Sequence, residues 1–519
     1  MEKIKPTFFY TVLFLFFVAF SLTASGYDYD LWARLIAGMG FVQTGHVLKA
    51  DFLSYTPTHI WFDHEWGSGV IFYLTQHLFS STGLIILQSV LVFSIFFIIT
   101  KIIQLRGIKT TSAYNFLFYF FAFTSMCPII NEPIRCQMFS FLFFTLFLYI
   151  LELSRKGENR PLWILPFLMI FWNNLHGGCV SGIGLIIIYI VGEFLNKTPI
   201  KKYIYVLIPT VLVLIINPWG LDYLKFLATA VTMKRPDILE WWGLFSKYFL
   251  FEYTRLKFFM LVLLLTELFH LKSFSLKKMD KTKFLVLIAT LYLAISHVKL
   301  IPFFVISTAC FLYDDFYTVF NQIIKNIREK LNIKTPAFIN IFVFTKESLV
   351  YGIIIIFILA NIKAKAFEPI VNEYKYPIKE IEFVKINHIK GNLLIDFGQG
   401  SYASYKLYPD NLIFMDGRYE EVYYGYMVPL MKKFYLMNPG WDEILKKYPP
   451  DVMVIEKHYP VYNVLKTEKD WSLVYEGNLF GVFVKSKNLK KTYKKPSDDI
   501  KYYKKNLFDT NINFKNHLN

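Results

Sequence analysis

The sequence has few cysteines, and their spacing matches no metal-binding motif. Its 519 residues include only Cys127, Cys136, Cys179 and Cys310, too few and too scattered for a disulfide framework. Cys127 and Cys136 could pair if the loop beside them lies outside the cytoplasm, but we predict that both thiols are free and buried. The HExxH motif of zinc enzymes is also missing. A disulfide-stapled fold and a motif-defined zinc site are therefore excluded.

Acidic residues are also few relative to basic ones: the chain has 39 Asp and Glu and 56 Lys and Arg, which gives a net charge of +17. In a soluble protein this excess would suggest a nucleic-acid partner. The basic residues are not gathered on one folded module, so we predict no nucleic-acid binding. Hydrophobic residues make up 55% of the chain and the mean hydropathy is +0.39, which is too apolar for a soluble protein. We predict a multi-pass membrane protein.

Eleven apolar runs within residues 1–365 predict an all-α polytopic membrane domain. The runs are residues 7–25, 83–104, 112–130, 138–153, 161–173, 178–195, 203–217, 258–271, 284–297, 300–319 and 349–365. The first run could belong to a cleaved signal peptide. Its length of about 19 residues is enough to span a bilayer, however, and we predict an uncleaved helix.

The basic residues in the connections between runs predict the orientation of these helices. With the N-terminus in the cytoplasm, the five cytoplasmic connections hold a large excess of Lys and Arg, from Lys101 to Lys346. The short connections on the other side hold far fewer. Because the number of helices is odd, the C-terminal part of the chain is predicted to lie outside the cytoplasm, with the protein in the inner cell membrane.

Residues 366–485 are predicted to form an extracytoplasmic α/β domain. Four segments are typical of strands, because Gly, Asp or Pro interrupts their β-branched and aromatic residues: GNLLIDFGQG, NLIFMDGRYE, DVMVIEK and WSLVYEGNLFGVFVK. Helical periodicity lies between them, at residues 421–437 and 440–447. Residues 486–519 are rich in Lys and Asn and lack apolar periodicity, so we predict a poorly ordered tail.

The polar stretch of residues 26–66, between the first two runs, has too many ionisable groups to lie in hydrocarbon. Asp28 and Asp30 precede a predicted amphipathic helix over residues 31–42, whose N-terminal N–H groups favour ionised carboxylates. The helix is too short and too polar to span a bilayer. We predict that it lies flat on the membrane surface and dips these side chains into the lipid: Leu31, Leu35, Ile36, Met39 and Val42.

Asp28 and Asp30 are the main candidates for chemistry. Two carboxylates at a water–lipid boundary can act as a general base for an acceptor hydroxyl and as ligands of a divalent metal ion. The alternative is that one acid caps the helix and the other is solvated. Asp63-His64-Glu65 closes the same loop, and Glu65 is a third candidate metal ligand, although the cluster is equally typical of a helix start.

Side chains near the predicted outer helix ends are candidates for substrate binding. Arg135 is costly at a membrane face unless it meets an anion such as a lipid phosphate, or unless it snorkels to the headgroups. His297 and Lys299 form a second candidate phosphate-binding pair, whereas a lone His in a tight turn, such as His176, is more often structural. The complete predicted set is Asp51, His64, Glu65, Arg135, Gln137, His176, His297 and Lys299.

The order of these motifs resembles that of bacterial multi-pass glycosyltransferases of the GT-C superfamily, relatives of the protein mannosyltransferases and of family-39-like enzymes. The first loop carries Asp-x-Asp, then Asp51-Phe52-Leu53-Ser54-Tyr55-Thr56, Trp61 and His64-Glu65-Trp66. The later matches are Arg135-x-Gln137-x-Phe139, Asn174-x-His176-Gly177-Gly178, Asn217-Pro218-Trp219-Gly220 and Asp416-Gly417-Arg418. The resemblance covers most of the chain.

This resemblance implies an inverting glycosyltransferase of the hexosyltransferase type. Its expected partners are a polyprenyl-phosphate-linked sugar donor, membrane lipids, and a glycan, lipid or protein acceptor outside the cytoplasm. The resemblance implies that Asp28 or Asp30 is the base. It also implies that Arg135, His297 and Lys299 hold the donor phosphate.

The sequence departs from the relatives at two points. Gly243 follows Trp241-Trp242, so the Trp-Trp-Asp signature of oligosaccharyltransferases is missing, which argues against transfer of whole oligosaccharides to Asn. Protein mannosyltransferases have Asp-Glu where this chain has Asp-Tyr-Asp. The rival functions are a transporter or flippase of lipid-linked glycans and a non-catalytic membrane assembly protein. A transporter should repeat ionisable or helix-breaking residues at mid-membrane in two halves, and the sequence shows no such repeat.

Overall fold

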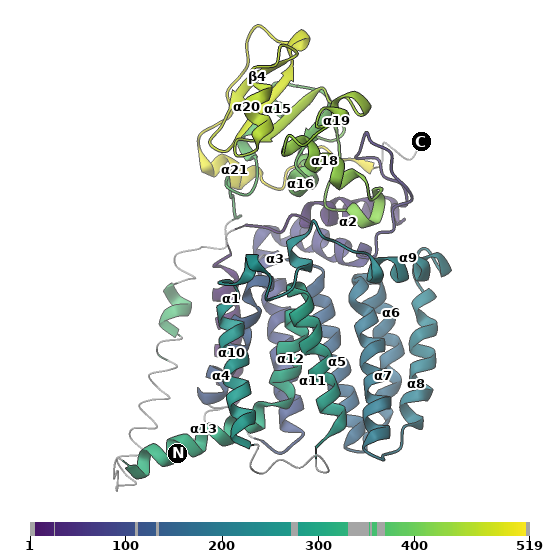
Figure 1. The fold of residues 1–519 in the computed structure, drawn as a ribbon, viewed down its shortest axis with the longest axis vertical. Coiled ribbons are helices and arrows are strands. Elements are labelled where there is room, and N and C mark those ends of the chain that lie inside the picture. The colour runs from purple at the N-terminus through teal and green to yellow at the C-terminus, as the bar shows by residue number, and fades with distance from the viewer. Residues whose placement is uncertain are drawn as a thin grey trace.

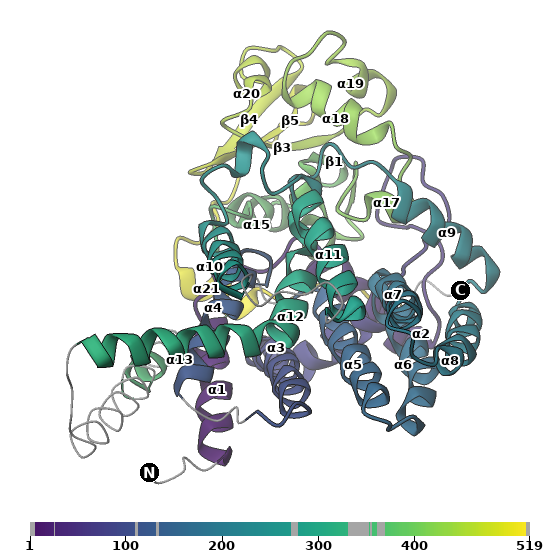
Figure 2. The same ribbon diagram turned by 60° about the horizontal axis from the view of Figure 1, so that its bottom comes forward.

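The computed structural model describes residues 6–24, 26–108, 113–130, 134–270, 279–330, 352, 355–360 and 369–514. Helices run side by side in a bundle, and a smaller α/β domain covers one end of it, which we call the domain end (Figure 1). The helix α13, Tyr313–Lys330, lies across the opposite end (Figures 1 and 2).

The bundle consists of apolar helices. The helices are α1 (Pro6–Ser21), α3 (Trp66–Gln104), α4 (Ala113–Ile130), α5 (Gln137–Arg155), α6 (Leu165–Leu175), α7 (Val180–Leu195), α8 (Lys201–Leu212), α10 (Thr254–His270), α11 (Lys281–Ser296) and α12 (Ile301–Phe311). The connecting 3-10 turns are η1 (Arg160–Ile164), η2 (Gly177–Cys179), η3 (Val213–Ile215), η4 (Leu239–Trp241), η5 (Lys247–Phe249) and η7 (Val298–Leu300). The helix α9, Leu221–Thr232, lies at the domain end (Figure 1).

The prediction of eleven spans is not confirmed. Within the described residues, three segments are long and apolar enough to cross a membrane: Trp66–Gln104, Gln137–Arg155 and Gly177–Leu195. Val298–Phe311 with Tyr313–Ile323, bent by 59°, would make a fourth. The predicted run 300–319 therefore divides between α12 and α13, and most of the run 349–365 lies outside the described residues. Helix α3 starts well before the predicted residue 83 and is broken at Ser80, where φ is 53°.

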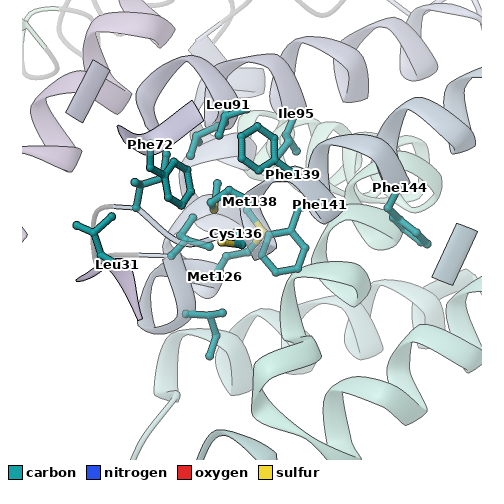
Figure 3. Close-up of a cluster of buried hydrophobic side chains, with 14 of the residues drawn as sticks. Leu31, Phe72, Leu91, Ile95, Met126, Cys136, Met138, Phe139, Phe141 and Phe144 are labelled. Atoms are coloured by element: carbon teal, nitrogen blue, oxygen red, sulfur yellow. The ribbon is translucent and has the colours of Figure 1, made fainter. Parts of the chain in front are cut away.

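An apolar core runs through the bundle and continues into the α/β domain. Figure 3 shows Phe72, Leu91 and Ile95 of α3 beside Met138 and Phe139 of α5, with Leu31 close to them. All four cysteines are free and buried, which confirms the prediction for Cys127 and Cys136. Leu31 of this core comes directly after Asp30, so charged groups of the first loop lie at the edge of an apolar core, where their ionisation is sensitive to burial and to neighbouring charges.

The prediction that residues 31–42 lie on the membrane surface is wrong. The helix exists as α2, Leu31–Thr44, but residues 31 to 40 are buried between the bundle and the α/β domain (Figure 1). Small residues permit this close packing, because a Cβ atom on Gly38 would lie 2.0 Å from the carbonyl oxygen of Gly69 in α3. On the other side, the Trp32 ring lies 4.9 Å from that of Tyr402. Of the five side chains assigned to lipid, only Val42 is exposed.

The α/β domain is built on a five-stranded sheet in the order β2-β1-β3-β5-β4. The strands β1 (Gly391–Ile395), β2 (Asn411–Ile413), β3 (Val452–Glu456), β4 (Trp471–Glu476) and β5 (Phe480–Lys485) all fall in the predicted segments. The pairs β2–β1 and β1–β3 are parallel, and β3–β5 and β5–β4 are antiparallel, with Gly391 opposite Asn411 and Val454 opposite Val482. The helices are α15 (Ile378–Ile386), α16 (Phe397–Leu407), α17 (Tyr419–Val422), α18 (Met427–Tyr435), α19 (Glu443–Lys447) and α20 (Pro460–Leu465).

The prediction of a poorly ordered tail is not borne out for residues 486–514. They form η8, Ser486–Asn488, and α21, Ile500–Asn506, and pack against the α/β domain. The buried Lys406 donates to carbonyl oxygens of Asn506 and Asp509, each at 2.7 Å. Four apolar side chains of this segment are buried, namely Tyr503, Leu507, Ile512 and Phe514. Their spacing is irregular, so periodicity did not reveal them, and residues 515–519 lie outside the described part.

Candidate active site

Arg34, in the first turn of α2, lies at the centre of a group of charged side chains that we call the Arg34 cluster. Its Nη2 donates to both carboxylate oxygens of Glu421, at 3.0 and 2.8 Å, and its Nη1 donates to Asp63. Glu65 Oε2 lies 3.5 Å from its Nε. Glu421 also accepts a hydrogen bond from Trp61 Nε1 at 2.7 Å. Because Glu421 belongs to α17, the cluster joins the first loop to the α/β domain.

Two partly buried histidines flank Glu65. His64 Nδ1 lies 3.2 Å from Glu421 Oε1, and His64 Nε2 lies 3.6 Å from Glu65 Oε1. Burial lowers the pKa of His64, but Glu65 and Glu421 together outweigh burial and raise that pKa to about 9. His176 Nε2 lies 3.4 Å from the same oxygen of Glu65. Burial and the nearby positive charges hold the pKa of His176 well below its usual value.

Arg135, before α5, forms the centre of a second group, the Arg135 cluster, with Asp28, Glu240 and Lys299. Its Nε lies 3.1 Å from Asp28 Oδ2, its Nη2 donates to Glu240 Oε2 at 2.9 Å, and its Nη1 donates to Glu240 Oε1. Lys299 Nζ lies 3.9 Å from Glu240. Although burial raises the pKa of Glu240, Arg135 and Lys299 lower it to about 2. Arg135 is therefore engaged by two carboxylates within the protein and does not snorkel to the headgroups.

Asp30 lies between the two clusters. It stands at the N-cap position of α2 but makes no side-chain capping hydrogen bond, so the capping alternative is wrong for this acid. Burial, Asp28 and Glu65 raise the pKa of Asp30 to about 8, against the opposite effect of Arg135 and Lys299. The expectation that both first-loop acids are simply ionised is therefore wrong for Asp30. Among the described residues, its carboxylate forms no ion pair within 4 Å, which leaves it available to a substrate.

Three predicted site residues have other positions. Asp51 accepts from the buried Arg418 at 2.7 Å, and the two residues tie the first loop to the α/β domain outside both clusters. His297 Nδ1 donates to the carbonyl oxygen of Trp241 at 2.7 Å and so holds the turn that carries Glu240. Gln137 is buried at the first position of α5.

The sequence did not single out Arg34, Glu240 or Glu421 as site residues. Glu240 comes directly before the Trp241-Trp242 pair, and Glu421 lies three residues after the Asp416-Gly417-Arg418 motif, so each glutamate lies beside a recognisable sequence motif. Neither motif, however, indicates which arginine the glutamate pairs with. Glu421 is 387 residues from Arg34 and Glu240 is 105 residues from Arg135.

One group in the described part of the chain has side chains suited to a metal ion: His64, Glu65 and Glu421, whose ligand atoms lie within 4.8 Å of one another. Of the predicted candidates Asp28, Asp30 and Glu65, only Glu65 belongs to this group. Asp28 is instead paired with Arg135.

No protein-family model and no curated protein sequence matches the chain. The structure is similar to the crystal structure of an oligosaccharyltransferase from Archaeoglobus fulgidus, solved with a tethered acceptor peptide that contains the NVT sequon. The TM-score is 0.54 at 10% sequence identity, over 97% of this chain and 77% of that chain. The chain therefore has the same overall fold as that oligosaccharyltransferase. A mycobacterial arabinofuranosyltransferase gives a TM-score of 0.49 at 11% identity, over 93% of this chain and 40% of that one.

This fold agrees with the motif resemblance in the sequence, and it brings most of the predicted residues together. Asp28, Asp30, Glu65, His64 and His176 all belong to, or lie beside, the two clusters at the domain end. Arg135 and Lys299 complete the group, and their charges act on Asp30. The site is therefore assembled from the first loop, the turns before α5, α7 and α12, and α17 of the α/β domain.

Proposed function

We propose that the protein is an integral-membrane inverting glycosyltransferase that moves a sugar from a polyprenyl-phosphate donor to a glycan, lipid or protein acceptor outside the cytoplasm. The observation that carries this proposal is the position of Asp30, a carboxyl with a raised pKa between Arg135, Lys299 and the Arg34 cluster. A lipid-linked sugar presents its phosphate at the headgroup level above an apolar chain. Acids and cations at one end of an apolar bundle fit such a donor, and the fold shared with the oligosaccharyltransferase supports the proposal.

In the proposed reaction, Asp30 takes the proton of the acceptor hydroxyl. The hydroxyl oxygen then attacks the anomeric carbon from the side opposite the phosphate, so the configuration inverts and the phosphate leaves with the bonding electron pair. Lys299 and Arg135 stabilise the negative charge that develops on the phosphate. Asp28 and Glu240 hold the guanidinium of Arg135 in place. The proton remains on Asp30 until product leaves.

The test is transfer by the purified protein from a radiolabelled polyprenyl-phosphate sugar to acceptors in a membrane extract. A glycosyltransferase releases unlabelled polyprenyl phosphate and forms a labelled product. A flippase would move the donor across the bilayer of a proteoliposome without forming product, and an assembly protein would do neither. Absence of product with donors of several sugar types, together with donor movement, would replace the proposal by the flippase function.

Topology gives a separate prediction. The first loop contacts the α/β domain through Arg34 and Glu421, so the two must lie on the same side of the membrane. Reporter fusions after Thr58 and after Lys485 are both expected to report an extracytoplasmic position. A fusion after Lys197, at the other end of α7, is the control and should report the cytoplasm. A cytoplasmic signal from Thr58 or Lys485 would contradict the predicted orientation.

Donor binding should depend on the two cations of the Arg135 cluster. Lys299→Gln is expected to weaken donor binding by about 1.5–3 kcal/mol, the range for a hydrogen bond to a charged group, and to raise the KM for the donor accordingly. Arg135→Lys should retain donor binding only in part, since an ammonium cannot form two parallel hydrogen bonds. The control is Lys225→Gln, which removes an exposed lysine of α9. An unchanged KM in Lys299→Gln, Arg135→Lys and Arg135→Gln would remove these residues from the donor site.

A further inference from the structure

We propose that His64, Glu65 and Glu421 bind a divalent transition-metal cation, so that the first loop and the α/β domain complete one metal site between them. This deepens the proposed function, and it rests on that function only for its catalytic consequence: a bound cation would supply positive charge to the donor phosphate. The binding itself requires no sugar transfer and is tested without it.

The three side chains supply suitable ligand atoms. An imidazole nitrogen and two carboxylate oxygens are a donor set that manganese and zinc accept, and here these atoms lie within 4.8 Å of one another. His64 Nδ1 is inaccessible to solvent and forms no well-aligned hydrogen bond, although Glu421 Oε1 is only 3.2 Å away. A nitrogen and a carboxylate oxygen this close, with no proton shared in good geometry, fit a cation that takes the place of any proton on Nδ1 and binds both atoms.

The charges of the Arg34 cluster do not balance. Three carboxylates, those of Asp63, Glu65 and Glu421, surround the single guanidinium of Arg34. The side chains of Arg34, Asp63 and Glu421 are no more than 4% exposed, so water screens this imbalance poorly. A divalent cation beside Glu65 and Glu421 would add positive charge to this excess of carboxylates.

The hydrogen bonds around His176 keep its imidazole uncharged, so His176 adds no positive charge to the cluster. Trp172 Nε1 donates to Ser140 Oγ at 2.7 Å, which leaves the Ser140 hydroxyl proton to donate to His176 Nδ1, also at 2.7 Å. The backbone N–H of Gly178 donates to the same nitrogen at 2.9 Å. His176 Nδ1 therefore accepts, and Nε2 carries the proton and points to Glu65.

This arrangement orients Glu65 without neutralising it. A second proton on His176 would have to displace the donors at Nδ1, so Glu65 is held by an uncharged N–H group. Carboxylates that bind metals are commonly oriented by hydrogen bonds of this kind from groups behind them. Trp172, Ser140 and His176 are accordingly positioning residues for the ligand Glu65.

The experiment is a titration of the purified full-length protein with Mn²⁺, after removal of metal by a chelator and with no donor or acceptor present. Free Mn²⁺ is measured by electron paramagnetic resonance. We expect one bound ion per chain. Binding should weaken at least tenfold in Glu65→Gln and in His64→Asn, and about 10- to 100-fold in His176→Asn, the usual effect of losing a group that orients a ligand.

The control variant is Glu443→Gln, which removes an exposed carboxylate of α19 and should leave Mn²⁺ binding unchanged. Glu421→Gln is a weaker test because it also breaks the pair with Arg34, whereas Glu65 and His64 are partly exposed and their variants keep that pair. The proposal is overturned if the wild-type protein binds no Mn²⁺, in which case a protonated His64 serves as the counter-charge. It is also overturned if Glu65→Gln and His64→Asn bind as the wild type does. If the wild-type protein binds Mn²⁺ but transfers no sugar, the proposed function is contradicted and the metal site is not.

Discussion

Asp30→Asn is expected to lower the turnover of sugar transfer about 100-fold or more, the usual scale for the loss of a general base. Asparagine has almost the same shape as aspartate, and the Asp30 side chain makes no capping hydrogen bond, so the fold should be retained. Asp28→Asn should act differently, because Asp28 Oδ2 holds Arg135 and Asp28 Oδ1 accepts the backbone N–H of Asp30. Its effect should fall mainly on the KM for the donor.

The pH dependence separates Asp30 from a structural acid. The pKa of Asp30 is raised to about 8, and a base acts only when it is deprotonated, so kcat/KM should rise with pH up to about 8 and then level off. This rising limb should disappear in Asp30→Asn, and Glu443→Gln should keep it. If Asp30→Asn and Asp28→Asn both retain near-normal turnover, the base must be sought at Glu65.

Arg34→Gln is expected to lower the free energy of unfolding by about 3–5 kcal/mol, the range for breaking a buried ion pair by removing one partner. Arg34 is 3% exposed, and its partners Asp63 and Glu421 are 1% and 4% exposed. Removal of the guanidinium leaves two buried carboxylates without their main counter-charge. The measurement is a denaturant titration of the protein in detergent, followed by tryptophan fluorescence, since Trp32 and Trp61 are buried at the junction with the α/β domain.

The control is Lys433→Gln, which breaks the exposed pair of Lys433 with Glu443 and should cost less than about 1 kcal/mol. The double variant Arg34→Gln with Glu421→Gln should recover part of the stability, because it removes one of the two unpaired charges. If Arg34→Gln is no more destabilising than Lys433→Gln, the Arg34 cluster does not hold the α/β domain on the bundle.

The sequence alone determined the local elements of this protein. Apolar runs predicted most of the bundle helices, and β-branched and aromatic runs broken at Gly, Asp and Pro predicted four segments that contain all five strands, because both signals depend on neighbouring residues. The acids of the first loop were singled out because ionisable groups are costly in hydrocarbon, and Asp30, Glu65 and Arg135 do lie together at the domain end. The GT-C resemblance followed from the order of such motifs and agrees with the fold.

The tertiary structure alone decided which charges meet and which helices are covered. Residues 31–44 have the composition of an interfacial helix, and only the α/β domain packed above them shows that they are buried. The partner of Arg34 lies 387 residues away in α17, and no local spacing encodes such a pair. The raised pKa of Asp30 likewise depends on burial and on Asp28 and Glu65 around it. The ionisation and the ion pairs of a side chain depend on its surroundings in the folded protein. For this reason the sequence offers Asp28 and Asp30 equally as the candidate base, and only the tertiary structure favours Asp30.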